Sequence, residues 1–307
     1  MGRAVTAAVA FACGVAAACL YLAVMLRTPG AVILVYMTQL PLFLAGLWLG
    51  AGAAALAGLT GAIVLLAASD VLGAAIFAAV NAVPVALLVR QALLARRAGD
   101  GTAVWYPPGL LTGWLTALGL AGIAIAFLLL GGPRELQATL RGAVGEALDR
   151  LARHPLPNRD QAAGTIAMVI PGIVAASWMV MLVANAALAQ GLLVRFGANW
   201  RPSPDLARLG LPLWLPVTLW LAAAAVMLGG TPRLVGINML IALGVPFCLA
   251  GLAVLHAAAR RLSHPAMALL CFYMMGALFG WPFLAVAVLG LLESWLGLRH
   301  RLASSGS

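Results

Sequence analysis

The chain has 307 residues, of which 64% are hydrophobic and only 8% are charged, and its mean hydropathy is +1.07. A soluble domain normally carries about a quarter charged residues, so this composition excludes a water-soluble fold. The net charge of +10 comes from arginine alone, since the sequence has no Lys. These arginines lie in short connections between apolar runs, which is typical of membrane proteins, and no basic cluster with interleaved aromatics suits a phosphate backbone. We therefore expect a membrane protein with the lipid bilayer, and no nucleic acid, as its partner.

Nine apolar runs follow one another along the chain. Because about 20 helical residues cross the hydrocarbon core, each of the first eight predicts one crossing. The runs are 4–26, 31–50, 51–69, 71–94, 109–131, 165–194, 211–229, 234–257 and 265–298. The sequence thus predicts an all-α, polytopic membrane bundle of about 8–10 spans in a single domain over 1–307. The expected parts of this domain are five spans in 4–131, an extramembrane segment at 132–163, further spans in 164–298 and a polar tail at 299–307.

The last run is too long for one ordinary crossing. Its 34 residues would extend about 50 Å as a helix, and Gly280-Trp281-Pro282 interrupts it near the middle, where Pro282 lacks an amide hydrogen. One tilted helix and a turned-back pair are both open. With the N-terminus in the cytoplasm, the turned-back ending puts eleven of the 18 arginines on the cytoplasmic side. The positive-inside rule favours that arrangement, with both termini in the cytoplasm. Because Arg and Ala codons are GC-rich and the sequence has no Lys, we expect a bacterial source and spans in the inner membrane.

The segment 132–163 is the one sizeable polar connection. Residues 133–153 predict an amphipathic helix between spans five and six, and two pairs, Glu146–Arg150 and Asp149–Arg153, have the i,i+4 spacing of ion pairs. Its apolar stripe consists of Leu136, Leu140, Val144, Leu148 and Leu151. We expect this helix at the membrane surface, as a structural element or as a lid or partner-docking helix.

Four amides near the middle of apolar runs are the candidate functional residues: Gln39, Asn81, Asn185 and Asn238. An amide in lipid needs hydrogen-bond partners, so all four should face the bundle interior. Two interpretations are open. The amides either hold helices together, or they build a site for a polar solute.

Prolines accompany these amides. Gln39 lies two residues before Pro41, and Asn81 lies three residues before Pro84. Broken helices beside polar side chains form the binding sites of many carriers, although proline is also common in ordinary membrane helices.

Signatures of catalysis are missing from the sequence. There is no Walker, HExxH or GxSxG pattern, and the four cysteines lie inside apolar runs without forming a CxxC pair. We expect no enzyme, no cofactor and no metal site.

Two stretches carry a resemblance to a known family. The first begins Gln-Leu-Pro-Leu-Phe-Leu-Ala-Gly-Leu-Trp-Leu-Gly at 39–50 and continues to Pro84. The second is Leu-Gly-Leu-Leu-Glu-Ser-Trp-Leu-Gly-Leu-Arg-His-Arg at 289–301. Together they resemble the YybS-like family of predicted bacterial membrane proteins, a domain of unknown function. The family-like residues of the ending are Gly290, Glu293, Trp295, Arg299 and Arg301; the family often has Asp where this chain has Glu293.

That family is similar to the substrate-binding S-components of energy-coupling-factor transporters. The resemblance implies that the chain binds a small solute and works with an external ATPase module. We therefore expect a small-solute binding or transport component. The alternative is a membrane scaffold or assembly factor that transports nothing, in which the amides only join helices.

Overall fold

The computed structural model describes residues 2–26, 28–151, 157–205 and 209–297. The chain forms two compact units, and each unit combines two stretches of sequence. Unit 1 consists of 1–111 and 180–205, and unit 2 consists of 112–179 and 206–307. The two long helices α7 (Pro108–Leu129) and α9 (Arg159–Arg195) each contribute residues to both units.

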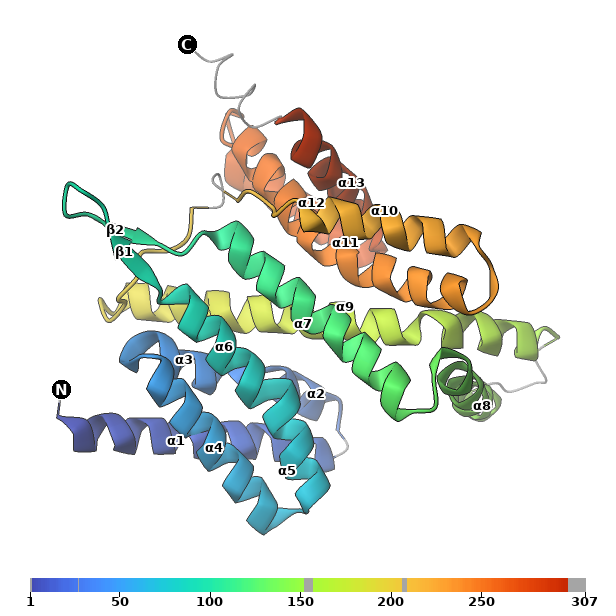
Figure 1. Ribbon diagram of the computed structural model, residues 1–307, viewed down its shortest axis with the longest axis horizontal. Helices are drawn as coiled ribbons and strands as arrows, with labels where there is room; N and C mark the ends of the chain where they lie inside the picture. Colours follow the sequence, from blue (N-terminus) through green and yellow to red (C-terminus); the bar gives the residue numbers. More distant parts are fainter. Residues whose placement is uncertain (1, 27, 152–156, 206–208, 298–307) are drawn as a thin grey trace. The chain divides into compact units, whose positions relative to one another are not determined.

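Unit 1 is built around α4, which contacts α1, α3, α5 and α6 (Figure 1). Its elements before α7 are α1 (Arg3–Leu22), η1 (Ala23–Leu26), α2 (Pro29–Tyr36), α3 (Gln39–Leu49), α4 (Ala51–Ala68), α5 (Val71–Phe77), the π-helical turn η2 (Ala78–Ala82) and α6 (Val83–Ala92). Small residues pack closely against one another in this unit. A Cβ at Gly46 would lie 2.8 Å from Ala54 Cβ, and one at Gly58 would lie 2.6 Å from Ala82 Cβ. Small side chains therefore let α3 and η2 approach α4 closely.

A short antiparallel hairpin follows α6, with strands β1 (Ala95–Arg97) and β2 (Ala103–Trp105). Gly99 and Asp100 are the central residues of its turn, and the Gly101 amide closes the turn by donating to the Ala98 carbonyl at 2.9 Å. Gly101 has a φ of +81°, which glycine adopts without strain. Asp100 Oδ1 accepts hydrogen bonds from the Thr102 amide at 3.0 Å and the Thr102 hydroxyl at 2.7 Å, and these bonds hold the pKa of the Asp100 carboxyl below its ordinary value. The hairpin is a small departure from the expected all-α chain.

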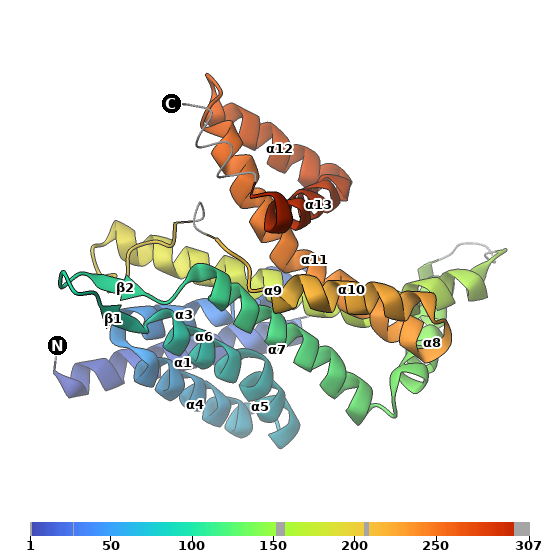
Figure 2. The ribbon, with the colours of Figure 1, turned by 45° about the horizontal axis from the view of Figure 1, so that its top comes forward.

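Unit 2 is built around α11 (Gly230–Ala259), which packs against α10 (Trp214–Met227) and α13 (Trp281–Leu296), as Figures 1 and 2 show. Leu215, Ala222, Leu243 and Phe247 form one buried apolar cluster in this unit. A Cβ at Gly290 would collide with the Phe247 carbonyl oxygen, and one at Gly251 with the Val286 carbonyl oxygen. The contact between α11 and α13 therefore depends on these two glycines.

The chain is a helical membrane bundle. Within the described ranges, seven helices are long and apolar enough to cross a membrane, or up to eight if α12 (Pro265–Phe279) and α13 together count as one span. The apolar helix α10 has 14 residues, fewer than the roughly 20 that a perpendicular crossing needs. The helix α9 begins at Arg159 and runs for 37 residues.

The last apolar run bends at the expected place. The chain bends by 117° between α12 and α13, and Gly280 between them has a φ of +71°. Only glycine adopts such a backbone conformation without strain, and Pro282 lies in the first turn of α13, where its missing amide hydrogen costs nothing. The break at 280–282 is confirmed. The side of the membrane on which the chain ends stays a prediction.

The amphipathic helix is α8 (Pro133–Leu151), and residues 152 and 153 lie outside the described residues. Its apolar stripe faces protein over most of its length, because Leu136 is buried and Leu140, Val144 and Leu148 are half-buried. The pair Glu146–Arg150 is confirmed at 3.2 Å.

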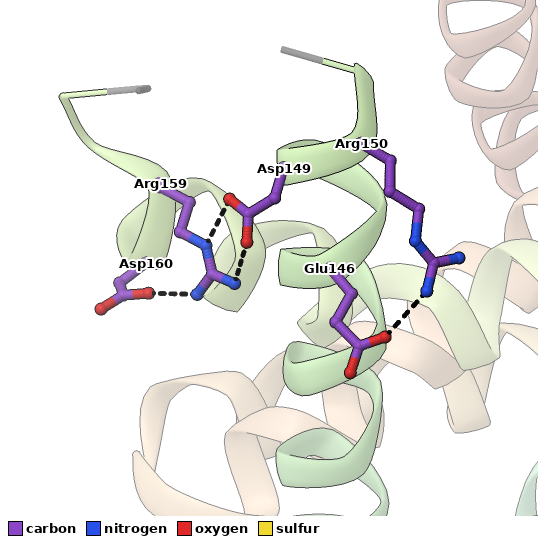
Figure 3. Close-up of polar contacts among 5 residues, drawn as sticks. All are labelled: Glu146, Asp149, Arg150, Arg159 and Asp160. Atoms are coloured by element: carbon purple, nitrogen blue, oxygen red, sulfur yellow. Dashed lines mark hydrogen bonds and ion pairs between the residues drawn. The ribbon is translucent and has the colours of Figure 1, made fainter. Parts of the chain in front are cut away.

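Asp149 of α8 contacts the neighbouring helix (Figure 3). Its two oxygens accept hydrogen bonds of 3.0 and 2.8 Å from the Arg159 guanidinium at the start of α9. Arg153, the partner expected from spacing, lies outside the described residues. Asp149 thus ties α8 to α9, which the spacing within one helix could not show.

Candidate functional site

The break between α2 and α3 is the first part of the candidate site in unit 1. Met37 adopts φ −89° and ψ −1°, a sparsely populated conformation in which many active-site residues lie. Pro41 explains the position of the break, because it has no amide hydrogen to donate to the Met37 carbonyl one turn earlier. The Leu40 amide instead donates to Met37 O at 3.0 Å. The apolar run 31–50 therefore consists of two helical pieces with a polar dipeptide, Thr38-Gln39, where they meet.

The π-helical turn η2 is the second part of the site. Pro84 follows it by two residues and has no amide hydrogen to donate to the Val80 carbonyl, so the helix widens just before the proline. This turn carries Asn81. Gln39 Nε2 donates a hydrogen bond of 3.2 Å to Asn81 Oδ1, and both side chains are buried. Two proline-induced irregularities in different helices are thus joined by their amides.

Asn185 is the third part of the site, and it comes from the unit 1 portion of α9. Asn185 Nδ2 donates to the Tyr36 carbonyl at 2.7 Å and to the Met181 carbonyl at 2.8 Å. Tyr36 is the last residue of α2, so this amide reaches the helix break across 149 residues of sequence. Because both partners of Nδ2 are acceptors, the orientation of the amide is fixed, and Oδ1 must point away from them.

Three oxygen atoms in this region are buried without a hydrogen-bond partner among the described residues: Thr38 Oγ1, Gln39 Oε1 and Asn185 Oδ1. Their residues are at most 1% exposed. An unpaired buried acceptor costs about 1–3 kcal/mol, so three in one region are a substantial and unusual expense in stability. We call Thr38, Gln39, Asn81 and Asn185 the polar cluster of unit 1.

Asn238 belongs to unit 2 and has a different environment. Its Oδ1 accepts from the Gly172 amide at 2.6 Å, and its Nδ2 donates to the carbonyls of Met168 at 3.0 Å and Leu234 at 2.8 Å. Met168 and Gly172 are four residues apart on α9, beside Pro171. The amide of Asn238 therefore bridges two backbone groups of one helical turn and has a partner for both of its polar atoms.

The structure thus divides the four amides expected from the sequence. In unit 1 it joins Gln39 to Asn81 and hydrogen-bonds Asn185 to the Tyr36 carbonyl, three residues before Gln39. In unit 2 it uses Asn238 to join α9 and α11. Whether the polar cluster binds a solute stays a prediction. In the part of the chain that the structure describes, no group of three or more His, Cys, Asp or Glu side chains lies close enough to hold a metal ion.

A family model for predicted membrane proteins, DUF2232, matches residues 15–294. The chain belongs to the DUF2232 family. The match covers nearly the whole chain, including 39–84 and the first part of the ending at 289–301. No curated protein and no solved structure matches the chain. The family assignment therefore agrees with the membrane fold and names no activity.

The structure describes the C-terminal motif 289–301 of this DUF2232 protein as far as Gly297. Gly290 packs against α11, Glu293 is buried, and Trp295 stacks on Trp220 of α10 with ring centroids 5.8 Å apart and planes 8° apart. Arg299 and Arg301 lie outside the described residues. Within the described part, the motif packs α13 onto its neighbours.

Arg201 is a buried charged residue that the sequence did not single out. It lies in the connection after α9 and is 6% exposed. Its guanidinium donates to the Ala92 carbonyl at 2.8 Å and to the Tyr106 carbonyl at 2.9 Å, which links the end of α6 to the end of the hairpin. Burial lowers the pKa of this guanidinium from its ordinary value. A single Arg between Trp200 and Pro202 looks like any loop charge, so only the fold reveals its role.

Proposed function

We propose that this DUF2232 protein is a small-solute binding or transport component of a bacterial inner membrane, and that the polar cluster of unit 1 is its solute site. The observation that carries the proposal is the set of three buried, unpaired oxygens at a helix break beside a π-helical turn. Helices that break inside a membrane bundle are a common way of building carrier sites. A cluster that served only to join helices would be expected to satisfy its own atoms, as Asn238 does in unit 2.

The proposed partner is an external ATPase module, as in the energy-coupling-factor transporters whose S-components the chain resembles. The sequence has no Walker motif, so any ATP-driven step needs a second protein. Affinity purification of the tagged full-length protein from its native membrane tests this part. Recovery of an ATPase pair supports the partnership, and its absence at native expression in a gently solubilised sample counts against it.

The test of the solute site is a thermal-shift screen of the purified full-length protein against a broad panel of vitamins and metabolites. A true ligand raises the unfolding temperature of the wild type in a concentration-dependent manner. The Asn185→Leu variant should lose that response. Asn238→Leu is the matched control, because it also removes a buried amide but lies in unit 2, so it should unfold at a lower temperature and keep the response.

A scaffold or assembly factor is the second candidate, and Asn238 favours it. This amide has three short hydrogen bonds to backbone groups and no atom left for a ligand. If all the amides behave in this way, their substitution lowers stability and no compound in the panel shifts the unfolding temperature. We infer a role without catalysis in either case, since neither candidate function calls for a nucleophile or a general base.

The proposed orientation places both termini in the cytoplasm. It rests on the confirmed break at Gly280 and on the arginine distribution in the sequence. Fusions of a cytoplasmic and a periplasmic reporter after Ser307 test it. Activity of the phosphatase reporter in the periplasm would contradict the turned-back ending.

A further inference from the structure

The unpaired atoms of the polar cluster restrict what a ligand must look like. Asn185 Oδ1 and Gln39 Oε1 are carbonyl oxygens and can only accept hydrogen bonds, while the Thr38 hydroxyl can accept or donate. A carboxylate or phosphate group placed here would face two acceptor oxygens without receiving a hydrogen bond from them. The complementary group is therefore one that carries donors or a positive charge.

The charge that this site tolerates is also limited. Every side chain of the cluster is neutral, and the titratable groups among the described residues nearest in sequence to its members are Tyr36, Asp70, Arg90 and Arg195. Divalent Ca²⁺ and Mg²⁺ are normally bound with carboxylate ligands, and an uncompensated double charge inside a membrane bundle is costly. Neutral hydroxyl and amide oxygens suit a single positive charge.

The two helix ends at the break do not by themselves decide whether the site prefers a positive or a negative charge. The α2 helix ends at Tyr36, and its C-terminal carbonyls favour a cation, whereas α3 begins three residues later with its positive end. The Asn185 amide nitrogen donates to the Tyr36 carbonyl, and its oxygen is left buried without a partner. The side-chain oxygens therefore determine the preference.

We propose that the polar cluster binds one singly charged cationic centre, coordinated by the oxygens of Thr38, Gln39 and Asn185. The inference rests on the proposed solute site and specifies its chemistry. Two sources share this chemistry: an alkali-metal ion that accompanies a solute, and the ammonium group of an organic solute. Both offer a positive centre to neutral oxygens.

The experiment measures unfolding temperature of the full-length protein in an uncharged detergent at constant ionic strength. N-methyl-D-glucamine chloride, the salt of a large organic cation, is replaced stepwise by lithium, sodium or potassium chloride in one arm and by methylammonium chloride in the other. If the unfolding temperature rises saturably with an alkali-metal ion, the cluster is an ion site. If it rises with methylammonium alone, the cluster is a site for an organic ammonium group.

Thr38→Val is the decisive variant because it keeps the shape of the side chain and removes one proposed oxygen. We expect its apparent affinity for the cation to fall by about tenfold or more, the equivalent of one charge-assisted contact. Thr60→Val is the matched control in unit 1, since the Thr60 hydroxyl already donates to the Leu56 carbonyl at 2.9 Å. Its response should equal that of the wild type.

Two results would overturn the inference: no shift of the wild type with any cation, or equal shifts of the wild type and Thr38→Val. If cations have no effect but a neutral or anionic metabolite stabilises the protein in a manner that depends on Asn185, the cationic chemistry is wrong and the solute site stands. If neither cations nor metabolites stabilise it, both proposals fall.

Discussion

Gln39 Nε2 and Asn81 Oδ1 form a buried hydrogen bond of 3.2 Å between the start of α3 and the π-helical turn η2. The bond connects two helices at the points where Pro41 and Pro84 disturb them. It therefore links the conformation of the break before α3 to that of η2, and we expect a conformational change at one to alter the other.

This bond makes a specific prediction for a double-mutant cycle. Asn81→Leu leaves the Gln39 amide nitrogen buried without its partner and should lower the free energy of unfolding by about 1–3 kcal/mol. Gln39→Leu also removes the unpaired Oε1, so it should cost less. The double variant should be more stable than the sum of the two effects predicts, by about 0.5 kcal/mol or more. Denaturation of the purified proteins in detergent measures all four corners, and strict additivity would show that the bond contributes nothing.

The contact between Gly172 and Asn238 in unit 2 predicts which of two substitutions there destabilises the protein more. Asn238→Ala removes three hydrogen bonds, but Met168 O and the Gly172 amide are four residues apart and can pair with each other as in any helix. We expect a loss of about 1 kcal/mol. A Cβ at Gly172 would lie 2.9 Å from both the Cα and the carbonyl oxygen of Asn238, so Gly172→Ala must push two backbones apart. It should cost more than Asn238→Ala in the same thermal unfolding assay, and the reverse order would contradict the close approach of α9 and α11.

Gly280 should be intolerant of a side chain. Its φ of +71° and ψ of −42° lie in a region that is strained for other residues, so Gly280→Ala should cost about 1–3 kcal/mol or straighten the bend. Gly244→Ala is the control, because Gly244 lies inside α11 and an added Cβ would meet nothing within 4 Å. That change should be neutral or slightly stabilising, since alanine favours the helix. Equal unfolding temperatures for the two variants would argue against a fixed bend.

Arg201 should matter more than an ordinary loop arginine. Arg201→Met keeps much of the buried apolar stem but leaves the carbonyls of Ala92 and Tyr106 without the guanidinium, and we expect a loss of about 1–3 kcal/mol. Arg195→Met at the exposed end of α9 is the control and should change stability little. Similar losses for both variants would mean that the Arg201 contacts do not stabilise unit 1.

The contact between Asp149 and Arg159 should depend on pH. Hydrogen bonds from Arg159 hold the pKa of the Asp149 carboxyl below its ordinary value of 3.8. Its contribution to stability is therefore fully present above that value and disappears as the pH falls through the lowered pKa. The protection of the α8 amides against hydrogen exchange, relative to their intrinsic rates, should fall in this acidic range more in the wild type than in Asp149→Asn. That variant lacks the charge at every pH. The same pH profile for both proteins would show that the pair does not hold α8.

The membrane class of the fold could be predicted from sequence because hydropathy and span length are local properties that the bilayer itself imposes. The bend at Gly280 was predictable for the same reason, since Gly-Trp-Pro marks it within three residues. The partners of the amides were not, because Asn185 meets Tyr36 and Asn238 meets Gly172 across separations of 149 and 66 residues. The role of Arg201 could not be predicted from the sequence, because its acceptors are backbone carbonyls and every residue has one.

The most direct test of the account is to identify the small molecules that the protein carries. Full-length wild type and Asn185→Leu, purified in parallel in a mild detergent, are denatured, and the released compounds are compared by untargeted mass spectrometry. We predict that a polar solute is present in the wild type in near-stoichiometric amount and is strongly depleted in the variant, while Asn238→Leu retains it. The same compounds in equal amounts from wild type and Asn185→Leu would contradict a solute site at the polar cluster.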